Sequence, residues 1–182
     1  SLLPRSAAPR RARRAAARTA GSAALRATLL VRRTSARLRP LTGASGGREV
    51  DARADEFFAV FVRASAALEA AVEIERGLRS RAWPDGVGVR VRVGIHSGRP
   101  TLTDSGYVGL SVHTVARICS AAHGGQILIS GAARDAVGRA RPAGLRLRSL
   151  GSHRLRGLRE IARVRVLLQE LRRRHDHQLR LL

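Results

Sequence analysis

Apolar residues repeat at helical spacing in two segments of the chain. From Ala64 to Ala82 they recur three or four positions apart, which places them along one side of an α-helix. The segment from Gly109 to His123 has the same spacing, and the pair at 124–125 (Gly-Gly) is expected to cap its C-terminus. We therefore predict two helices here and a brief third helix at Gly131–Val137.

Other segments have the pattern of β-strands. Val and Arg alternate strictly in Val87–Gly98, as in a strand with one apolar face. Further strands are predicted at Arg48–Arg53, Phe57–Val62, Gln126–Ser130, Leu145–Leu155 and Ile161–Leu168. The resulting order β-β-α-β-α-β-(α)-β-β indicates an α+β fold with the helices on one face of the sheet.

The charge of the chain is large and unevenly distributed. Its 35 basic residues, all arginine, oppose 13 acidic ones, for a net charge of +22. Residues 1–47 contain 11 arginines and no acidic residue, residues 48–140 contain 12 against 10, and residues 141–182 contain 12 against 3. The middle of the chain is therefore nearly neutral, and the two ends carry almost all the excess.

This distribution predicts three parts. Residues 1–46 are expected to be an Arg/Ala-rich, low-complexity arm, disordered or partly helical, with a short amphipathic helix within 25–41. A mitochondrial targeting segment and a GC-rich coding bias are alternative explanations of this composition. Residues 47–168 form the expected folded domain, and 169–182 a basic tail or linker.

The composition also excludes several kinds of protein. A single cysteine excludes a disulfide framework and a Cys-rich metal site, and the absence of lysine excludes a phosphate-loop lysine. The apolar runs are far shorter than the ~18 residues of a membrane-spanning helix, so we expect a cytoplasmic protein.

Cys119 is expected to be a buried free thiol, Trp83 to pack at the base of the first helix, and His96 to lie in the core or an interface.

Three segments in order carry a resemblance to a known family. They are GREVDARADEFFAVF (47–61), VRVGIHSGRPTLTDSGYVGLSVHTVARICSAAHGGQILIS (91–130) and LGSHRLRGL (150–158). Together they resemble the catalytic domain of class III adenylate/guanylate cyclases, in particular the actinobacterial form with the pattern GYVGLxVHxxARI. Relative to that family the chain is N-terminally incomplete or degenerate.

The resemblance implies a fold and a reaction. The family fold is a ferredoxin-like antiparallel sheet with helices, and here its first strand is expected to be missing. The implied reaction converts ATP to 3′,5′-cyclic AMP and pyrophosphate with two Mg²⁺ or Mn²⁺ ions, at a site between the subunits of a homodimer. The actinobacterial form often precedes an ATPase and a DNA-binding regulator domain, which implies a role in intracellular signalling.

The resemblance also assigns roles to individual residues. Asp55 matches the second metal-binding aspartate, and Arg117 matches the arginine that stabilises the transition state. His113 replaces the asparagine that orients the ribose, and Arg156 replaces the lysine that binds the triphosphate.

The positions that read the base also depart from the family pattern. In adenylate-specific members they are commonly Lys and Asp, and here they are Asp51 and Gly106. Gly106 has no side chain, so the identity of the base is not encoded in the usual way.

One departure bears on activity. No acidic residue precedes Glu49, so the first metal-binding aspartate is absent however the N-terminus is aligned. We therefore predict a cyclase homologue that is inactive or impaired. An alternative is a catalytically dead module for dimerisation or nucleotide sensing within a larger regulator. A second alternative is nonspecific binding of polyanions by the Arg-rich ends, since the few aromatic residues offer no stacking platform for sequence-specific nucleic-acid recognition.

Overall fold

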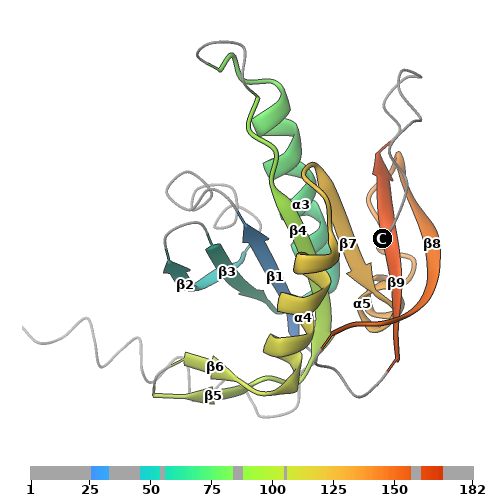
Figure 1. Cartoon of the computed structure of the whole chain (residues 1–182). Helices are drawn as coiled ribbons and strands as arrows, with labels where there is room; N and C mark the ends of the chain where they lie inside the picture. The colour runs from blue at the N-terminus through green and yellow to red at the C-terminus, as the bar shows by residue number, and fades with distance from the viewer. Residues whose placement is uncertain are drawn as a thin grey trace, which may run out of the picture.

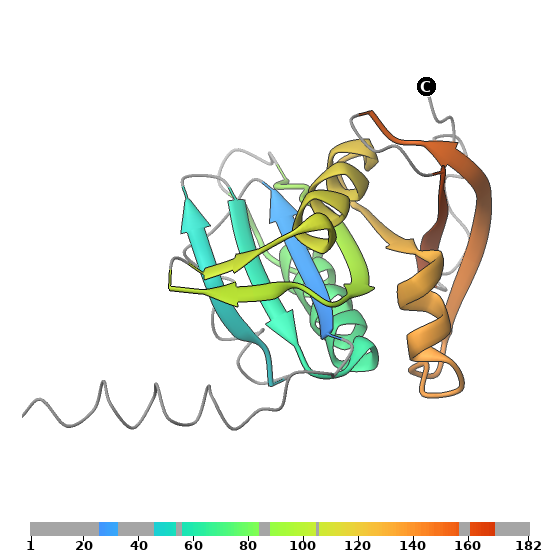
Figure 2. The same cartoon turned by 90° about the horizontal axis from the view of Figure 1, so that it is seen from below.

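The computed structural model describes residues 26–32, 46–53, 56–83, 88–104, 106–156 and 161–169. They form a seven-stranded sheet that is covered by helices on both faces, with a separate two-stranded hairpin beside it (Figures 1 and 2). The elements are β1 (Arg26–Arg32), β2 (Arg48–Arg53), β3 (Glu56–Phe61), α3 (Ala64–Arg79), β4 (Arg92–Gly98), β5 (Thr101–Thr103), β6 (Gly106–Val108), α4 (Leu110–Ala121), β7 (Gln126–Ser130), α5 (Gly131–Val137), β8 (Leu145–Arg154) and β9 (Ile161–Gln169). Within these described ranges, none of the helices has both the length and the apolar character needed to cross a membrane.

The strand order in the large sheet is β2-β3-β1-β4-β7-β9-β8. Every neighbouring pair is antiparallel except β4 and β7, which run parallel. The parallel pair arises because the chain leaves β4, forms the β5–β6 hairpin and α4, and returns to the sheet as β7. The sheet thus agrees with the predicted α+β class, with one parallel pair in a largely antiparallel arrangement.

Strand β1 corrects the prediction that the first strand is missing. It lies between β3 and β4, with Val31 opposite Phe57 on one side and Val93 on the other. A central strand that is covered on both faces reads as a short apolar run, here Ala27–Val31, rather than as an alternation. The flanking arginines made this run resemble part of a low-complexity arm. The predicted helix within 25–41 is wrong over 26–32, and its other residues lie outside the described ranges.

Helix α3 packs against one face of the sheet through small residues. Its buried side consists largely of alanines, with Leu68, Ile74 and Leu78, and it shares a core with apolar residues of β1, β3, β4, β7 and α5. The helix ends at Arg79, slightly earlier than the pattern predicted. The Trp83 indole N–H donates a hydrogen bond to the carbonyl oxygen of Leu78 at 3.0 Å, which confirms its predicted place at the base of this helix.

Helix α4 covers the opposite face, so the prediction of helices on one face only is wrong. Its residues Val115 and Cys119 form a second core with Phe58, Val60 and Tyr107, on the face away from α3 (Figure 1). Helical periodicity shows which side of a helix is apolar, but it does not say which face of a sheet that side will cover.

The contact between α4 and β4 is very close at Gly94. A Cβ atom added there would lie 2.7 Å from the backbone nitrogen of Cys119 and 2.9 Å from the carbonyl oxygen of Val115. Cys119 is a fully buried free thiol, as predicted, and its S–H donates to the carbonyl oxygen of Arg92 at 3.3 Å. Glycine at position 94 is therefore a requirement for this packing rather than a turn residue.

Three local predictions also differ from the structure. The strand predicted from Val87 begins at Arg92, and the loop after β4 contains the β5–β6 hairpin. Helix α4 ends at Ala121 with Ala122 extended, so Gly124 and Gly125 do not cap it. They form the turn into β7, where Gly125 has φ +87 and its N–H donates to the carbonyl oxygen of Val91 at 2.7 Å.

We predict that Gly94→Ala destabilises the protein by about 1–3 kcal/mol, because the new methyl group would push α4 away from β4. The measurement is urea unfolding followed by circular dichroism. Gly88→Ala is the matched control, since an added Cβ at Gly88 meets no atom within 4 Å. Equal stability of the two variants would show that the contact at Gly94 is not close in solution.

Candidate functional site

The outer side of α4 carries two of the predicted site residues. His113 and Arg117 are exposed and lie one helical turn apart, so their side chains share one side of the helix. The buried side of the same helix, with Val115, Ile118 and Cys119, is packed on the sheet. His113 and Arg117 face outward because the apolar residues of the helix are buried against the sheet.

The hairpin β5–β6 brings Gly106 to strand β2. An added Cβ at Gly106 would lie 3.7 Å from Cγ1 of Val50, the neighbour of Asp51 in the chain. Gly106 has φ +122, a backbone conformation that side chains rarely adopt. The two positions expected to read the base therefore come together, although the side chain of Asp51 is outside what the structure describes.

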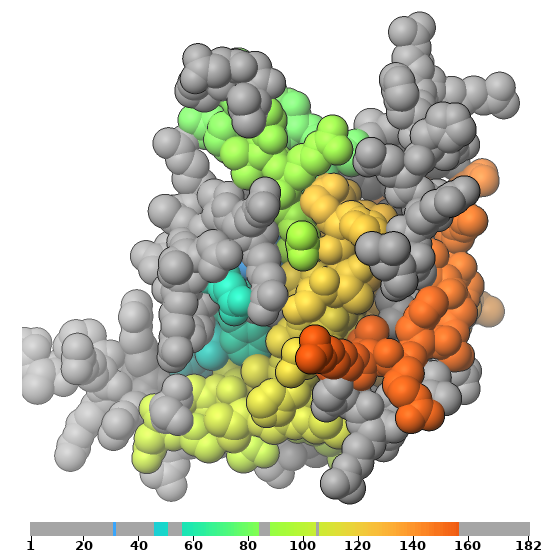
Figure 3. All heavy atoms as spheres, in the orientation of Figure 1, coloured from blue at the N-terminus to red at the C-terminus, as the bar shows by residue number. Residues whose placement is uncertain are grey.

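Arg156 is brought close to α4 by its neighbour Leu155. The Leu155 side chain is buried in a small core with Ile118, Ala122 and Leu128, and Arg156 itself is exposed. Figure 3 shows the orange end of this segment against the yellow atoms of α4. The structure thus gathers the predicted cations Arg117 and Arg156 in the region of α4.

The predicted metal ligand Asp55 lies outside the described residues, but the strands around it are described. Register places Arg32, the last residue of β1, opposite Glu56 in β3 and opposite Arg92 in β4. Guanidinium groups cannot coordinate divalent cations, which take oxygen ligands. Of these three paired positions, Glu56 alone carries a carboxylate.

The other described residues also provide no cluster of metal ligands. Among the side chains that the structure describes, no three His, Cys, Asp or Glu residues lie together as a metal site would require. His175 and His177, at the C-terminal end, are outside the described part of the chain.

A polar contact that the sequence did not predict joins the ends of β4 and β7. His96 Nδ1 lies 3.0 Å from Ser130 Oγ, and Ser130 Oγ accepts a hydrogen bond from the N–H of Ala133 as the N-cap of α5. Burial lowers the pKa of His96 below its ordinary value of 6.5. The pairing depends on the parallel register of Ile95 with Ile129, which the sequence pattern alone does not give.

Solved structures of nucleotide cyclases share this fold. An adenylate cyclase from Trypanosoma brucei, solved in its monomeric state, matches with a TM-score of 0.72 and 22% identity, over 81% of this chain and 91% of that chain. An adenylate/guanylate cyclase/hydrolase from Silicibacter pomeroyi matches with a TM-score of 0.69 and 22% identity, over 81% and 98%. The guanylate cyclase domain of RhGC from Catenaria anguillulae, in complex with GTP, matches with a TM-score of 0.66 and 17% identity, over 80% of this chain and 96% of that chain.

Similar sequences occur among curated proteins. The chain is 40% identical over 104 residues to the uncharacterized protein Rv0891c of Mycobacterium tuberculosis, over 57% of this chain and 34% of that protein. It is 36% identical over 110 residues to an adenylate cyclase of Mycosarcoma maydis, over 47% of this chain and 4% of that protein. The chain thus spans about a third of the length of its mycobacterial relative. No protein-family model matches the chain.

These comparisons confirm the predicted α+β fold. The chain has the fold of class III adenylate/guanylate cyclase domains. The actinobacterial type, the roles of the site residues and the activity stay predictions.

We predict that His96 makes the protein less stable as the pH falls below 6.5. Its folded-state pKa is lowered, so between pH 6.5 and that lower value the unfolded chain binds a proton that the folded chain does not. Above pH 6.5 both states are neutral at this residue and the effect vanishes. The measurement is urea unfolding at pH 7.5 and pH 5.5, for the protein and for His96→Asn.

The expected result is a larger loss of stability for the unchanged protein than for the variant over this range. Carboxylates titrate in both proteins and cancel in the comparison. An equal loss in both would mean that His96 has the same pKa in the folded and unfolded states.

Proposed function

We propose that the chain is a class III nucleotidyl cyclase homologue with impaired catalysis, which binds a nucleoside triphosphate as a dimerising module of a larger signalling protein. The observation that carries the proposal is the register of β1 with β3. It places Arg32, the last residue of β1, opposite Glu56, which follows Asp55 in the sequence. A carboxylate is required there by the resemblance, and none precedes Glu49.

The chemistry explains why this substitution matters. Cyclisation needs the ribose 3′-oxygen deprotonated and aimed at the α-phosphorus, and two cations supply both activation and charge neutralisation. A single carboxylate would hold such a pair of cations poorly, because each divalent cation takes several oxygen ligands. In our proposal Mg²⁺ or Mn²⁺ would therefore bind weakly, together with the nucleotide.

The cations on the other side of the site support retained nucleotide binding. Arg117 and Arg156 are exposed, and guanidinium groups bind phosphate oxygens through two parallel hydrogen bonds. A similar guanylate cyclase domain was solved with GTP, and a rhodopsin-guanylyl cyclase with converted specificity was solved with ATPαS. We propose ATP as the nucleotide of this chain.

The arrangement on a single chain also supports a homodimer. Strand β2, which contains Asp51, is at one edge of the sheet, and Gly106 lies beside it. His113 and Arg117 lie on α4, over the middle strands. In our proposal a second copy brings one half of the site against the other. The attached regulator domain and the cytoplasmic location belong to the same proposal.

We predict that the purified chain with ATP and either Mg²⁺ or Mn²⁺ forms no cyclic AMP above a heat-denatured sample. Asp55→Ala is expected to leave this background unchanged. Product formation that disappears in Asp55→Ala would overturn the proposed impairment. Product that persists in Asp55→Ala would indicate a contaminating cyclase and would be removed by further purification.

We also predict that ATP binds to the chain and that Arg156→Gln weakens this binding about tenfold, or about 1.4 kcal/mol. The measurement is isothermal titration calorimetry. Arg63→Gln is the matched control, because Arg63 is exposed at the start of α3, on the face opposite α4. Unchanged binding in Arg156→Gln would remove Arg156 from the site.

A further inference from the structure

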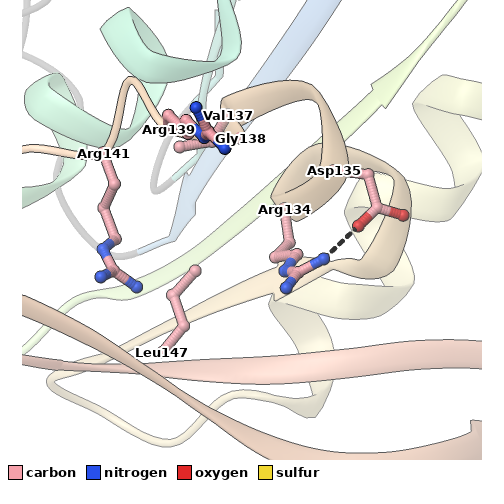
Figure 4. Close-up of a pocket in the computed structure, with 7 residues that line it drawn as sticks. All are labelled: Arg134, Asp135, Val137, Gly138, Arg139, Arg141 and Leu147. Atoms are coloured by element: carbon pink, nitrogen blue, oxygen red, sulfur yellow. Dashed lines mark hydrogen bonds and ion pairs between the residues drawn. The ribbon is translucent and has the colours of Figure 1, made fainter.

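A pocket lies between α5 and β8, away from the residues discussed above (Figure 4). Its volume is about 570 Å³, within the range of about 300–1,000 Å³ that is usual for small-molecule sites. It is lined by Arg134, Asp135, Val137, Gly138, Arg139, Arg141 and Leu147.

The charge of the pocket is positive. Three arginines line it against one carboxylate, and that carboxylate, Asp135, is already bound to Arg134 at 2.8 Å. No ion pair is described for Arg139 or Arg141, both exposed, within the described part of the chain. Residues 136–156 contain no other acidic residue. Two guanidinium groups are therefore available to an anion.

The directions of the side chains favour one binding position. In Figure 4 the guanidinium groups of Arg134 and Arg141 extend from opposite sides toward the space beside Leu147. The ion pair with Asp135 holds Arg134 in this direction. A phosphate group between the two arginines would receive hydrogen bonds from both, and guanidinium geometry suits phosphate oxygens.

Part of the pocket wall is apolar. Val137 is buried, and Leu147 is half-buried and packs against the core that α3 shares with the sheet. A purely inorganic anion would leave this wall uncovered. The combination suits a ligand with a phosphate at one end and an apolar or aromatic group at the other.

The backbone of the pocket is well supported. The N–H of Gly138 donates to the carbonyl oxygen of Arg134 at 3.1 Å, and the N–H of Ala140 donates to that of Val137 at 3.0 Å. Gly138 has φ +51, which turns the chain out of α5. Arg139 and Arg141 therefore project from a hydrogen-bonded turn, so less conformational entropy is lost when an anion binds.

We propose that the α5–β8 pocket is a binding site for a phosphomonoester of about the size of a mononucleotide. It lies on the face of the sheet that carries α3, because α5 packs with α3, whereas α4 lies on the other face. The site is thus separate from the nucleotide position on α4 and does not depend on the proposed function.

The test is titration of the full chain with adenosine 5′-monophosphate at about 0.15 M salt, where exposed charges are screened. The variant Arg134→Gln/Arg141→Gln is compared with Arg63→Gln/Arg99→Gln, which loses the same charge at two exposed positions outside the pocket. We expect at least about tenfold weaker binding in the pocket variant and less than about twofold change in the control. Adenosine, which lacks the phosphate, should bind at least about tenfold more weakly than the monophosphate.

Equal weakening in both double variants would overturn the proposal in favour of general electrostatic attraction, and no weakening in either would overturn it as well. Loss of binding in Arg156→Gln alone would place the monophosphate at the α4 site and also overturn it.

A second measurement follows the NMR signals of the methyl groups. Added monophosphate should shift the signals of Val137 and Leu147 and leave those of Val115, on the buried side of α4, unchanged.

Discussion

The contact of α4 with strand β4 at Gly94 determines the position of half of the predicted site residues. The helix approaches so closely that a methyl group at Gly94 would meet the backbone of Cys119. Because the helix is held there, His113 and Arg117 face outward while Val115 and Cys119 are buried. Leu155 then packs against the same helix and brings Arg156 with it. One close backbone contact thus orders side chains from two separate parts of the chain.

The central strand β1 supports the fold through its pairing with strands on both sides. It pairs along its whole length with β3 and β4, and Val31 is fully buried. These interactions need a short apolar run and do not need a carboxylate at the end of the strand. The place of β1 in the sheet is therefore independent of the metal chemistry that the resemblance predicts at its end.

The two faces of the sheet separate two kinds of site. The α4 face carries His113 and Arg117, which the resemblance predicts to act on a nucleotide. On the α3 face, the α5–β8 pocket is built from one chain, with arginines above an apolar wall. The overall excess of arginine had suggested a diffuse attraction to polyanions. The structure shows that some of these arginines lie in a defined pocket, where geometry as well as charge can select a ligand.

Local patterns in the sequence were sufficient for much of the secondary structure. The spacing of Ala67, Leu68, Ala71 and Ile74 predicted α3, and the pattern of Arg48–Arg53 predicted β2 with its observed bounds. The absence of any acidic residue before Glu49 was also a property of the sequence alone. These features depend only on residues close together in the chain.

Other features depend on residues that are distant in sequence. They are the place of β1 in the sheet, the face that α4 covers, and the contact of His96 with Ser130. Only the folded sheet brings such residues together, so the tertiary structure alone decided them.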